Sequence, residues 1–72
     1  MSSDELTAIR AQAALLPPGR YNWSDGALFP GWHGTIGYAT VDVSIYHDGS
    51  ISYWDWRHLT FSTDNRLVIR EP

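Results

Sequence analysis

The segment that decides the fold is residues 41–56, which read VDVSIYHDGSISYWDW. Two runs of alternating apolar and polar residues flank the tetrapeptide His47-Asp48-Gly49-Ser50. Asp-Gly between two alternating runs is among the strongest short-range signals for a β-hairpin. We therefore expect an antiparallel hairpin from Thr35 to about Leu59.

The side-chain pattern favours one of two registers for this hairpin. If Tyr46 lies opposite Ile51, one face combines Ala39, Val41, Val43, Ile45, Ser52, Trp54, Trp56 and His58. If Tyr46 lies opposite Ser50, Val41 faces Asp55, and the two tryptophans join Thr40, Asp42 and Ser44. The first register separates apolar from polar residues better, so we predict that register, with both tryptophans in the core.

The predicted register places a candidate partner-binding surface on the other face of the hairpin. Its residues are Tyr38, Asp42, Tyr46, Tyr53, Asp55 and Arg57. Tyrosine and arginine are over-represented at binding hot spots. Asp42 is expected directly opposite Asp55, where diagonal Arg57 would relieve part of the repulsion. The surface therefore suits the basic side chains of a partner protein, unless the helix covers it or these are ordinary cross-strand pairs.

The N-terminal part of the chain predicts a helix over residues 2–16. Ser2 and Glu5 have the spacing of a capping box, and Pro17-Pro18 stops the helix. An apolar stripe at helical spacing consists of Leu6, Ile9, Ala13 and Leu16. We expect this stripe to pack on the sheet.

The rest of the chain predicts further short strands. A strand is expected over 20–23, then a loop over 24–34 whose apolar residues are Leu28, Phe29 and Trp32. A bulge near Arg57-His58, a turn at Asp64-Asn65 and a strand over 66–70 follow. The predicted fold is α+β: one domain, residues 1–72, with an N-terminal helix packed on a three- to four-stranded antiparallel meander over 19–71.

Composition argues against several classes of function. The formal net charge is −3, and five scattered arginines with no lysine do not form the basic patch that nucleic-acid binding requires. The chain has no cysteine, its first residues are acidic, and its longest apolar run is Ala13–Leu16. We expect a cytoplasmic protein that contacts neither nucleic acid nor membrane.

No residue pattern indicates catalysis or a cofactor. Asp42 and Asp55 are the one candidate acid–base pair, but no nucleophile or oxyanion donor accompanies them. His33, His47 and His58 lack the spacing of metal ligands. We expect no enzyme activity, no cofactor and no metal.

These observations favour a non-catalytic protein-binding module that blocks a surface of a larger complex, such as one that itself binds nucleic acid. In size and charge the chain is similar to the small inhibitors of phages and mobile elements, anti-CRISPR proteins among them. The alternatives are a module for carbohydrates or other small ligands, and a structural or assembly subunit.

Overall fold

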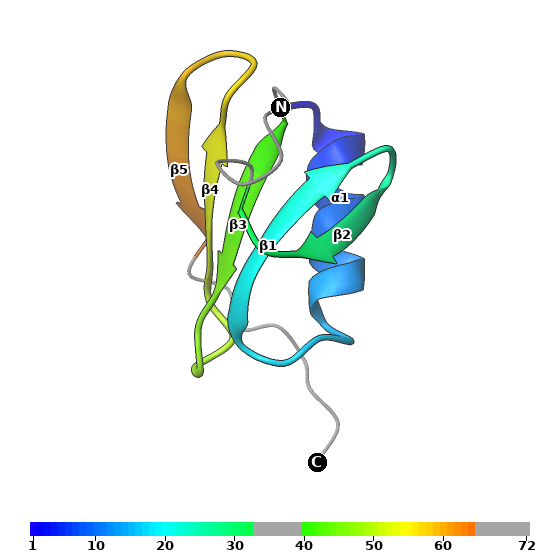
Figure 1. Cartoon of the computed structure of the whole chain (residues 1–72), viewed down its shortest axis with the longest axis vertical. Coiled ribbons are helices and arrows are strands. Elements are labelled where there is room, and N and C mark those ends of the chain that lie inside the picture. Colours follow the sequence, from blue (N-terminus) through cyan, green and yellow to red (C-terminus); the bar gives the residue numbers. More distant parts are fainter. Residues whose placement is uncertain (33–39, 65–72) are drawn as a thin grey trace.

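A computed structural model describes residues 1–32 and 40–64, in which one helix packs on a five-stranded antiparallel sheet (Figure 1). The elements are α1 (Ser3–Ala13), β1 (Gly19–Ser24), β2 (Ala27–Pro30), β3 (Val41–Ile45), β4 (Ile51–Asp55) and β5 (Thr60–Asp64). The strand order is β2-β1-β3-β4-β5, so β1 lies between β2 and β3 in the sheet. The predicted α+β fold is confirmed, with five strands instead of three to four.

The helix forms as predicted and ends earlier than expected. Ser2 is its N-cap, and its Oγ accepts a hydrogen bond from the Glu5 backbone N–H at 3.1 Å. Ala13 is the last helical residue, and Ala14 to Leu16 form a turn before the two prolines. In the described part of the chain, no helix is long and apolar enough to cross a membrane.

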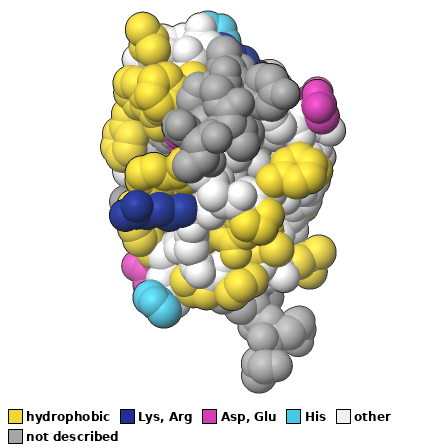
Figure 2. All heavy atoms as spheres, in the orientation of Figure 1, with side chains coloured by type: hydrophobic (Ala, Val, Ile, Leu, Met, Phe, Trp, Pro, Cys, Tyr) yellow, Lys and Arg dark blue, Asp and Glu magenta, His cyan; other side chains and the backbone are white. Residues whose placement is uncertain are grey.

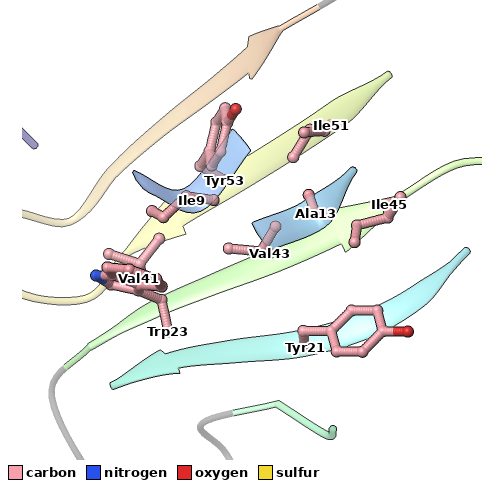
Figure 3. Close-up of a cluster of buried hydrophobic side chains, with 9 residues drawn as sticks. All are labelled: Ile9, Ala13, Tyr21, Trp23, Val41, Val43, Ile45, Ile51 and Tyr53. Atoms are coloured by element: carbon pink, nitrogen blue, oxygen red, sulfur yellow. The ribbon is translucent and has the colours of Figure 1, made fainter. Parts of the chain in front are cut away.

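The core lies between α1 and the face of the sheet that α1 covers. Figure 3 shows side chains of β1, β3 and β4 gathered around two helix residues, Ile9 and Ala13. The buried residues are Ile9, Ala13, Tyr21, Trp23, Val41, Val43, Ile45, Ile51 and Tyr53. Leu6 and Leu16 pack at its margin, so the predicted stripe faces the sheet.

The hairpin of β3 and β4 forms, but the predicted register is wrong. Val41 pairs with Asp55 and Ile45 with Ile51, which is the register with Tyr46 opposite Ser50. A two-residue Asp48-Gly49 turn would have given the predicted register. Instead the loop has three residues, 47–49, and Gly49 takes the left-handed conformation at φ 86°. One more loop residue turns every side chain of β4 to the opposite face.

A second hairpin, β1–β2, occupies part of the segment expected to be a loop. Asp25 and Gly26 have φ values of 51° and 78°, which fit a two-residue type I′ turn between Ser24 and Ala27. The strand predicted over 20–23 is confirmed with one more residue at each end. The predicted loop over 24–34 is wrong at Ala27–Pro30, because these residues pair with β1.

A turn over residues 56–59 replaces the predicted bulge at Arg57-His58. Leu59 has a φ of 51° there, and the chain reverses into β5, which pairs along the whole of β4. Asp64 ends β5. Several predicted features lie outside the described residues, namely Tyr38 and the rest of the segment 35–39, Asn65 of the predicted second turn and the strand predicted over 66–70.

Candidate functional site

The face of the sheet away from α1 carries a groove with aromatic walls. Its volume is about 260 Å³, and we call it the aromatic groove. The lining residues are Trp32, Asp42, Ser44, Tyr46, Ser52, Tyr53, Trp54, Trp56 and Phe61. Figure 2 shows hydrophobic side chains gathered over β4 and β5. Phe61 is 63% exposed and Tyr46 49% exposed, so these rings are accessible at the surface.

Strand pairing explains why these residues meet. One row of paired positions crosses all five strands, from Phe29 through Asn22, Asp42 and Trp54 to Phe61. Side chains alternate between faces along a strand, so the even-numbered residues of β3 and β4 share this face. Trp56 continues the same face beyond Trp54, and its backbone N–H donates to the Thr40 carbonyl at 2.8 Å.

Two tryptophans form one corner of the aromatic groove. The rings of Trp54 and Trp56 are nearly perpendicular, at 89°, with their centroids 5.6 Å apart. This edge-to-face arrangement is a favourable geometry for aromatic pairs. Trp56 Nε1 donates to Asp42 Oδ2 at 2.7 Å, which fixes its ring against the floor of the groove. We call these two rings the tryptophan corner.

Polar side chains form the floor beside the tryptophan corner. The buried Asp42 carboxylate also accepts a hydrogen bond at Oδ1 from Asn22 Nδ2, at 3.3 Å. Asn22 Nδ2 lies 2.5 Å from Thr40 Oγ1 as well. Farther along the groove, Tyr46 Oη and Ser52 Oγ are hydrogen-bonded at 3.0 Å. The floor therefore holds a carboxylate and hydroxyls in fixed positions between aromatic walls.

A cation already lies on one ring of this face. The Arg20 guanidinium sits 4.2 Å from the centroid of Trp32, which is cation–π geometry. Arg20 pairs with Ser44 in the row next to Asp42, so its side chain belongs to the same face. Trp32 is thus an aromatic ring of this face that binds a cationic side chain.

Charged side chains on the helix side of the sheet form a separate cluster. The buried Asp55 carboxylate accepts hydrogen bonds from the Arg57 backbone N–H at 2.9 Å and from Arg57 Nε at 3.0 Å. Arg57 also binds Glu5, whose Oε2 accepts from Trp23 Nε1 at 3.1 Å. Burial raises the pKa of Asp55, but hydrogen bonds from Arg57 and His58 outweigh it and hold the pKa well below its ordinary value. This cluster joins the start of α1 to the turn after β4.

The structure does not bring the six predicted site residues together. Asp42, Tyr46 and Tyr53 line the aromatic groove, although Tyr53 also belongs to the core, whereas Asp55 lies on the helix side and is bound to Arg57. Tyr53 is 2% exposed, and burial, followed by the charge of Asp64, raises its pKa to about 12. The predicted pairing of Asp42 with Asp55 and the relief by Arg57 are wrong, because the two carboxylates lie on opposite faces. Tyr38 lies outside the described residues.

Most of the groove was not predicted from the sequence, and the register error accounts for Ser52, Trp54 and Trp56. The groove residues left out of the predicted site are Trp32, Ser44, Ser52, Trp54, Trp56 and Phe61. The rejected register had grouped both tryptophans with Asp42 and Ser44. Trp54 and Trp56 were expected in the core, but they lie on the face away from α1, and Trp56 is 38% exposed.

The geometry supports binding through rings, hydroxyls and one carboxylate. Asp42 and Asp55 cannot share a proton across the sheet. Within residues 1–32 and 40–64, no three His, Asp or Glu side chains gather to hold a metal ion. No protein-family model matches the chain, and no curated protein or solved structure matches it either.

Proposed function

We propose that this chain is a non-catalytic protein-binding module that uses the aromatic groove and its rim as its interface. The observation that carries the proposal is the set of exposed rings around Asp42, namely Trp32, Tyr46, Trp56 and Phe61. Contiguous exposed apolar surface rimmed by polar groups marks interaction sites. Tryptophan and tyrosine also dominate the energy of protein interfaces because each buries a large area with few rotatable bonds.

The extent of the surface favours a protein over a small molecule. The row from Phe29 to Phe61 spans four inter-strand spacings of about 4.8 Å, or about 19 Å. Phe29 is half exposed and lies at the far edge of that row, outside the groove. A small ligand would fill the groove and leave Phe29 uncovered, whereas a protein surface covers both.

We further propose that binding inhibits a larger complex by occupying one of its surfaces. The formal net charge of −3 with no lysine favours encounter with a basic surface. Such an inhibitor needs no chemistry of its own. It needs an interface and a body large enough to exclude the natural ligand of that surface.

A carbohydrate-binding module is the second candidate, favoured by the mixed lining of the groove. Rings stack on the apolar faces of sugars, and the Tyr46–Ser52 hydroxyl pair and the Asp42 carboxylate are groups that bind sugar hydroxyls. This reading predicts that a free oligosaccharide binds and that no protein partner depends on the groove.

Capture followed by titration distinguishes the two candidates. The tagged chain is used to retain partners, and each retained protein is purified and titrated by calorimetry against wild type, Phe61→Ala and Leu15→Ala. Phe61 and Leu15 are both exposed apolar residues, but Leu15 follows α1 and lies outside the groove lining. We expect a 1:1 complex that Phe61→Ala weakens by about tenfold, equal to about 1.4 kcal/mol, and that Leu15→Ala leaves unchanged. Equal binding by Phe61→Ala would refute the interface, and saturable binding of an oligosaccharide instead would select the second candidate.

A further inference from the structure

We infer that Asp25, in the exposed turn between β1 and β2, is a site of spontaneous covalent modification, at which its peptide bond to Gly26 isomerises to isoaspartate. The sequence contains Asp-Gly twice, at 25–26 and at 48–49. Glycine has no side chain to shield its backbone nitrogen, so this dipeptide brings that nitrogen to the aspartyl carboxyl group with the least hindrance. The structure distinguishes the two copies and selects the first.

The reaction uses water alone. The backbone nitrogen of Gly26 attacks Cγ of Asp25 and loses its proton, while one oxygen of the carboxyl group leaves as water, which closes a five-membered succinimide ring. A second water then opens the ring. When that water cleaves the bond between the nitrogen and the former main-chain carbonyl carbon, the chain continues through Cβ and Cγ, and the carbonyl carbon becomes a free carboxylate. One water is released and one is taken up, so the mass of the protein is unchanged.

Both reacting groups of the first copy are unrestrained. Asp25 and Gly26 are exposed, and within residues 1–32 and 40–64 neither the Asp25 carboxylate nor the Gly26 N–H has a hydrogen-bond partner. A Cβ added to Gly26 would meet no heavy atom within 4 Å beyond its chain neighbours, so the approach to the turn is open. Asp25 has a φ of 51°, a left-handed conformation that is strained for an L residue. Rotation of the Asp25 backbone toward ring closure therefore relieves strain.

Both reacting groups of the second copy are held. Asp48 Oδ1 accepts hydrogen bonds from Ser50 Oγ at 2.6 Å and from the Ser50 backbone N–H at 2.9 Å. The Gly49 N–H donates to the Tyr46 carbonyl at 2.9 Å. The hydrogen bonds from Ser50, the hydroxyl first and then the backbone N–H, lower the pKa of Asp48 and keep its carboxyl group ionised. An ionised carboxylate is a poorer target for attack than the neutral acid, so both position and charge protect Asp48.

Gln12 of α1 restrains the first turn. Its Nε2 donates to the Gly26 carbonyl at 2.9 Å, and its Oε1 accepts from the Leu28 N–H at 3.0 Å. Ring closure requires rotation about the Asp25 backbone. The two hydrogen bonds resist that rotation because they tie the turn and the start of β2 to the helix. Local opening of this hairpin tip therefore controls the rate at Asp25.

The product changes the β1–β2 hairpin. Isoaspartate adds one carbon to the main chain inside a two-residue turn, which disturbs the pairing of Ser24 with Ala27 and the hydrogen bonds from Gln12. Phe29 lies on β2, so its place at the far edge of the proposed interface depends on the same turn. We therefore expect the modified chain to differ from the fresh chain first at β2.

Ageing of the folded protein tests the inference. Wild type is kept at neutral pH for several weeks, and the peptides that contain each Asp-Gly are fragmented by electron transfer, which identifies isoaspartate at unchanged mass. We expect Asp25 to isomerise about tenfold faster than Asp48, equal to about 1.4 kcal/mol of activation free energy. The same incubation in guanidinium chloride is the control, because both copies then lose their hydrogen bonds and should react at similar rates. An unchanged Asp25, or a reaction at Asp48 that is as fast or faster in the folded protein, would overturn the inference.

Two variants test the assigned restraints. Gln12→Ala removes both hydrogen bonds to the first turn, and it is expected to speed isomerisation at Asp25 by about fivefold while leaving Asp48 unchanged. Ser50→Ala removes the hydroxyl that binds Asp48, and it should speed the reaction there while leaving Asp25 unchanged. The other Asp-Gly is an internal control in each variant. Acceleration confined to the expected site supports the restraint assigned to it, and equal acceleration of both sites or of neither refutes it.

Discussion

Arg57 donates two hydrogen bonds to the carboxylate of Glu5, at 3.0 and 2.6 Å, across 52 positions of the chain. The same guanidinium binds Asp55 through Nε and Nη2, so it bridges two carboxylates. Glu5 lies in the first turn of α1, and Asp55 ends β4. The bridge therefore holds the N-terminal end of α1 against the sheet by ion pairing, while Ile9 and Ala13 hold the rest of the helix there by apolar contact.

Replacing Asp55 by Asn should destabilise the fold at pH 7. The change leaves Arg57 with one carboxylate in place of two, and because Arg57 is 35% exposed the cost is about 1–3 kcal/mol, less than for a fully buried pair. The pKa of Asp55 is lower in the folded state than in the unfolded chain, where it is about 3.9. Its stabilising effect is therefore complete above the unfolded pKa and is lost as the pH falls through the folded pKa.

Urea unfolding of wild type and Asp55→Asn between pH 7 and pH 2 measures both effects. The wild type should lose stability on acidification, and Glu5, whose pKa is also lowered, chiefly by Arg57, contributes in the same direction. The variant should be less stable at pH 7 and lose less on acidification. Parallel pH profiles for the two proteins would contradict the account.

Truncating the helix residue at the centre of the core should have a large effect. Ile9 is fully buried between α1 and the sheet, so Ile9→Ala should cost about 2–5 kcal/mol. Leu15→Ala is the matched control, because Leu15 is 84% exposed and its truncation should stay within about 0.5 kcal/mol. Chemical denaturation of the two variants gives both values, and similar losses would show that α1 does not pack as described.

Gly26 provides a test of backbone conformation without a packing effect. Its φ is 78°, and an added Cβ would meet no heavy atom within 4 Å beyond its chain neighbours. Gly26→Ala should therefore cost about 1 kcal/mol from the left-handed backbone alone. Gly26→Asn should cost less, because asparagine tolerates this conformation. Thermal unfolding of the pair checks the order, and a reversed order would exclude the type I′ turn.

Removing the Tyr53 hydroxyl should not harm the protein. The oxygen is buried, and among the described residues it has no hydrogen-bond partner. Tyr53→Phe removes an unsatisfied polar group, so it should be neutral or stabilising by about 0–1 kcal/mol. Partner binding should be unchanged, because the ring belongs to the core. A loss of affinity with intact stability would return Tyr53 to the interface.

The sequence predicts the elements of this fold better than their pairing. Ser2 and the stripe through Ile9 locate α1, because capping and helical spacing are local properties. Asp48-Gly49 locates the central hairpin, but the dipeptide serves both two-residue and three-residue loops. The choice between these loops depends on which face of β4 packs against α1. The residues around the loop carry no information about that packing.

Ser52, Trp54 and Trp56 were left out of the predicted site because the predicted register was wrong, and β2 was missed for another reason. Asp25-Gly26 is the same dipeptide that locates the central hairpin, but Ala27–Pro30 is short and ends in a proline, which weakens a strand prediction. The bridge from Arg57 to Glu5 spans most of the described chain, and no spacing rule predicts a contact at that distance. Asp55 was therefore predicted to be a surface charge, whereas the structure shows it as a buried ion-pair partner.

The three-residue loop at 47–49 has a consequence for how the gene can vary. Deleting one codon within the loop leaves Tyr46 opposite Ser50, so Tyr53 and Trp54 keep their faces, whereas deleting the codon of Ser52 would direct Trp54 toward α1 and Tyr53 outward. A change of length in the loop alters the turn alone, whereas a change of length inside β4 exchanges core and groove for the residues of the strand that follow it. A library of variants should therefore accept many amino acids and some changes of length between Tyr46 and Ser50, yet reject nearly every single-codon insertion or deletion within β4.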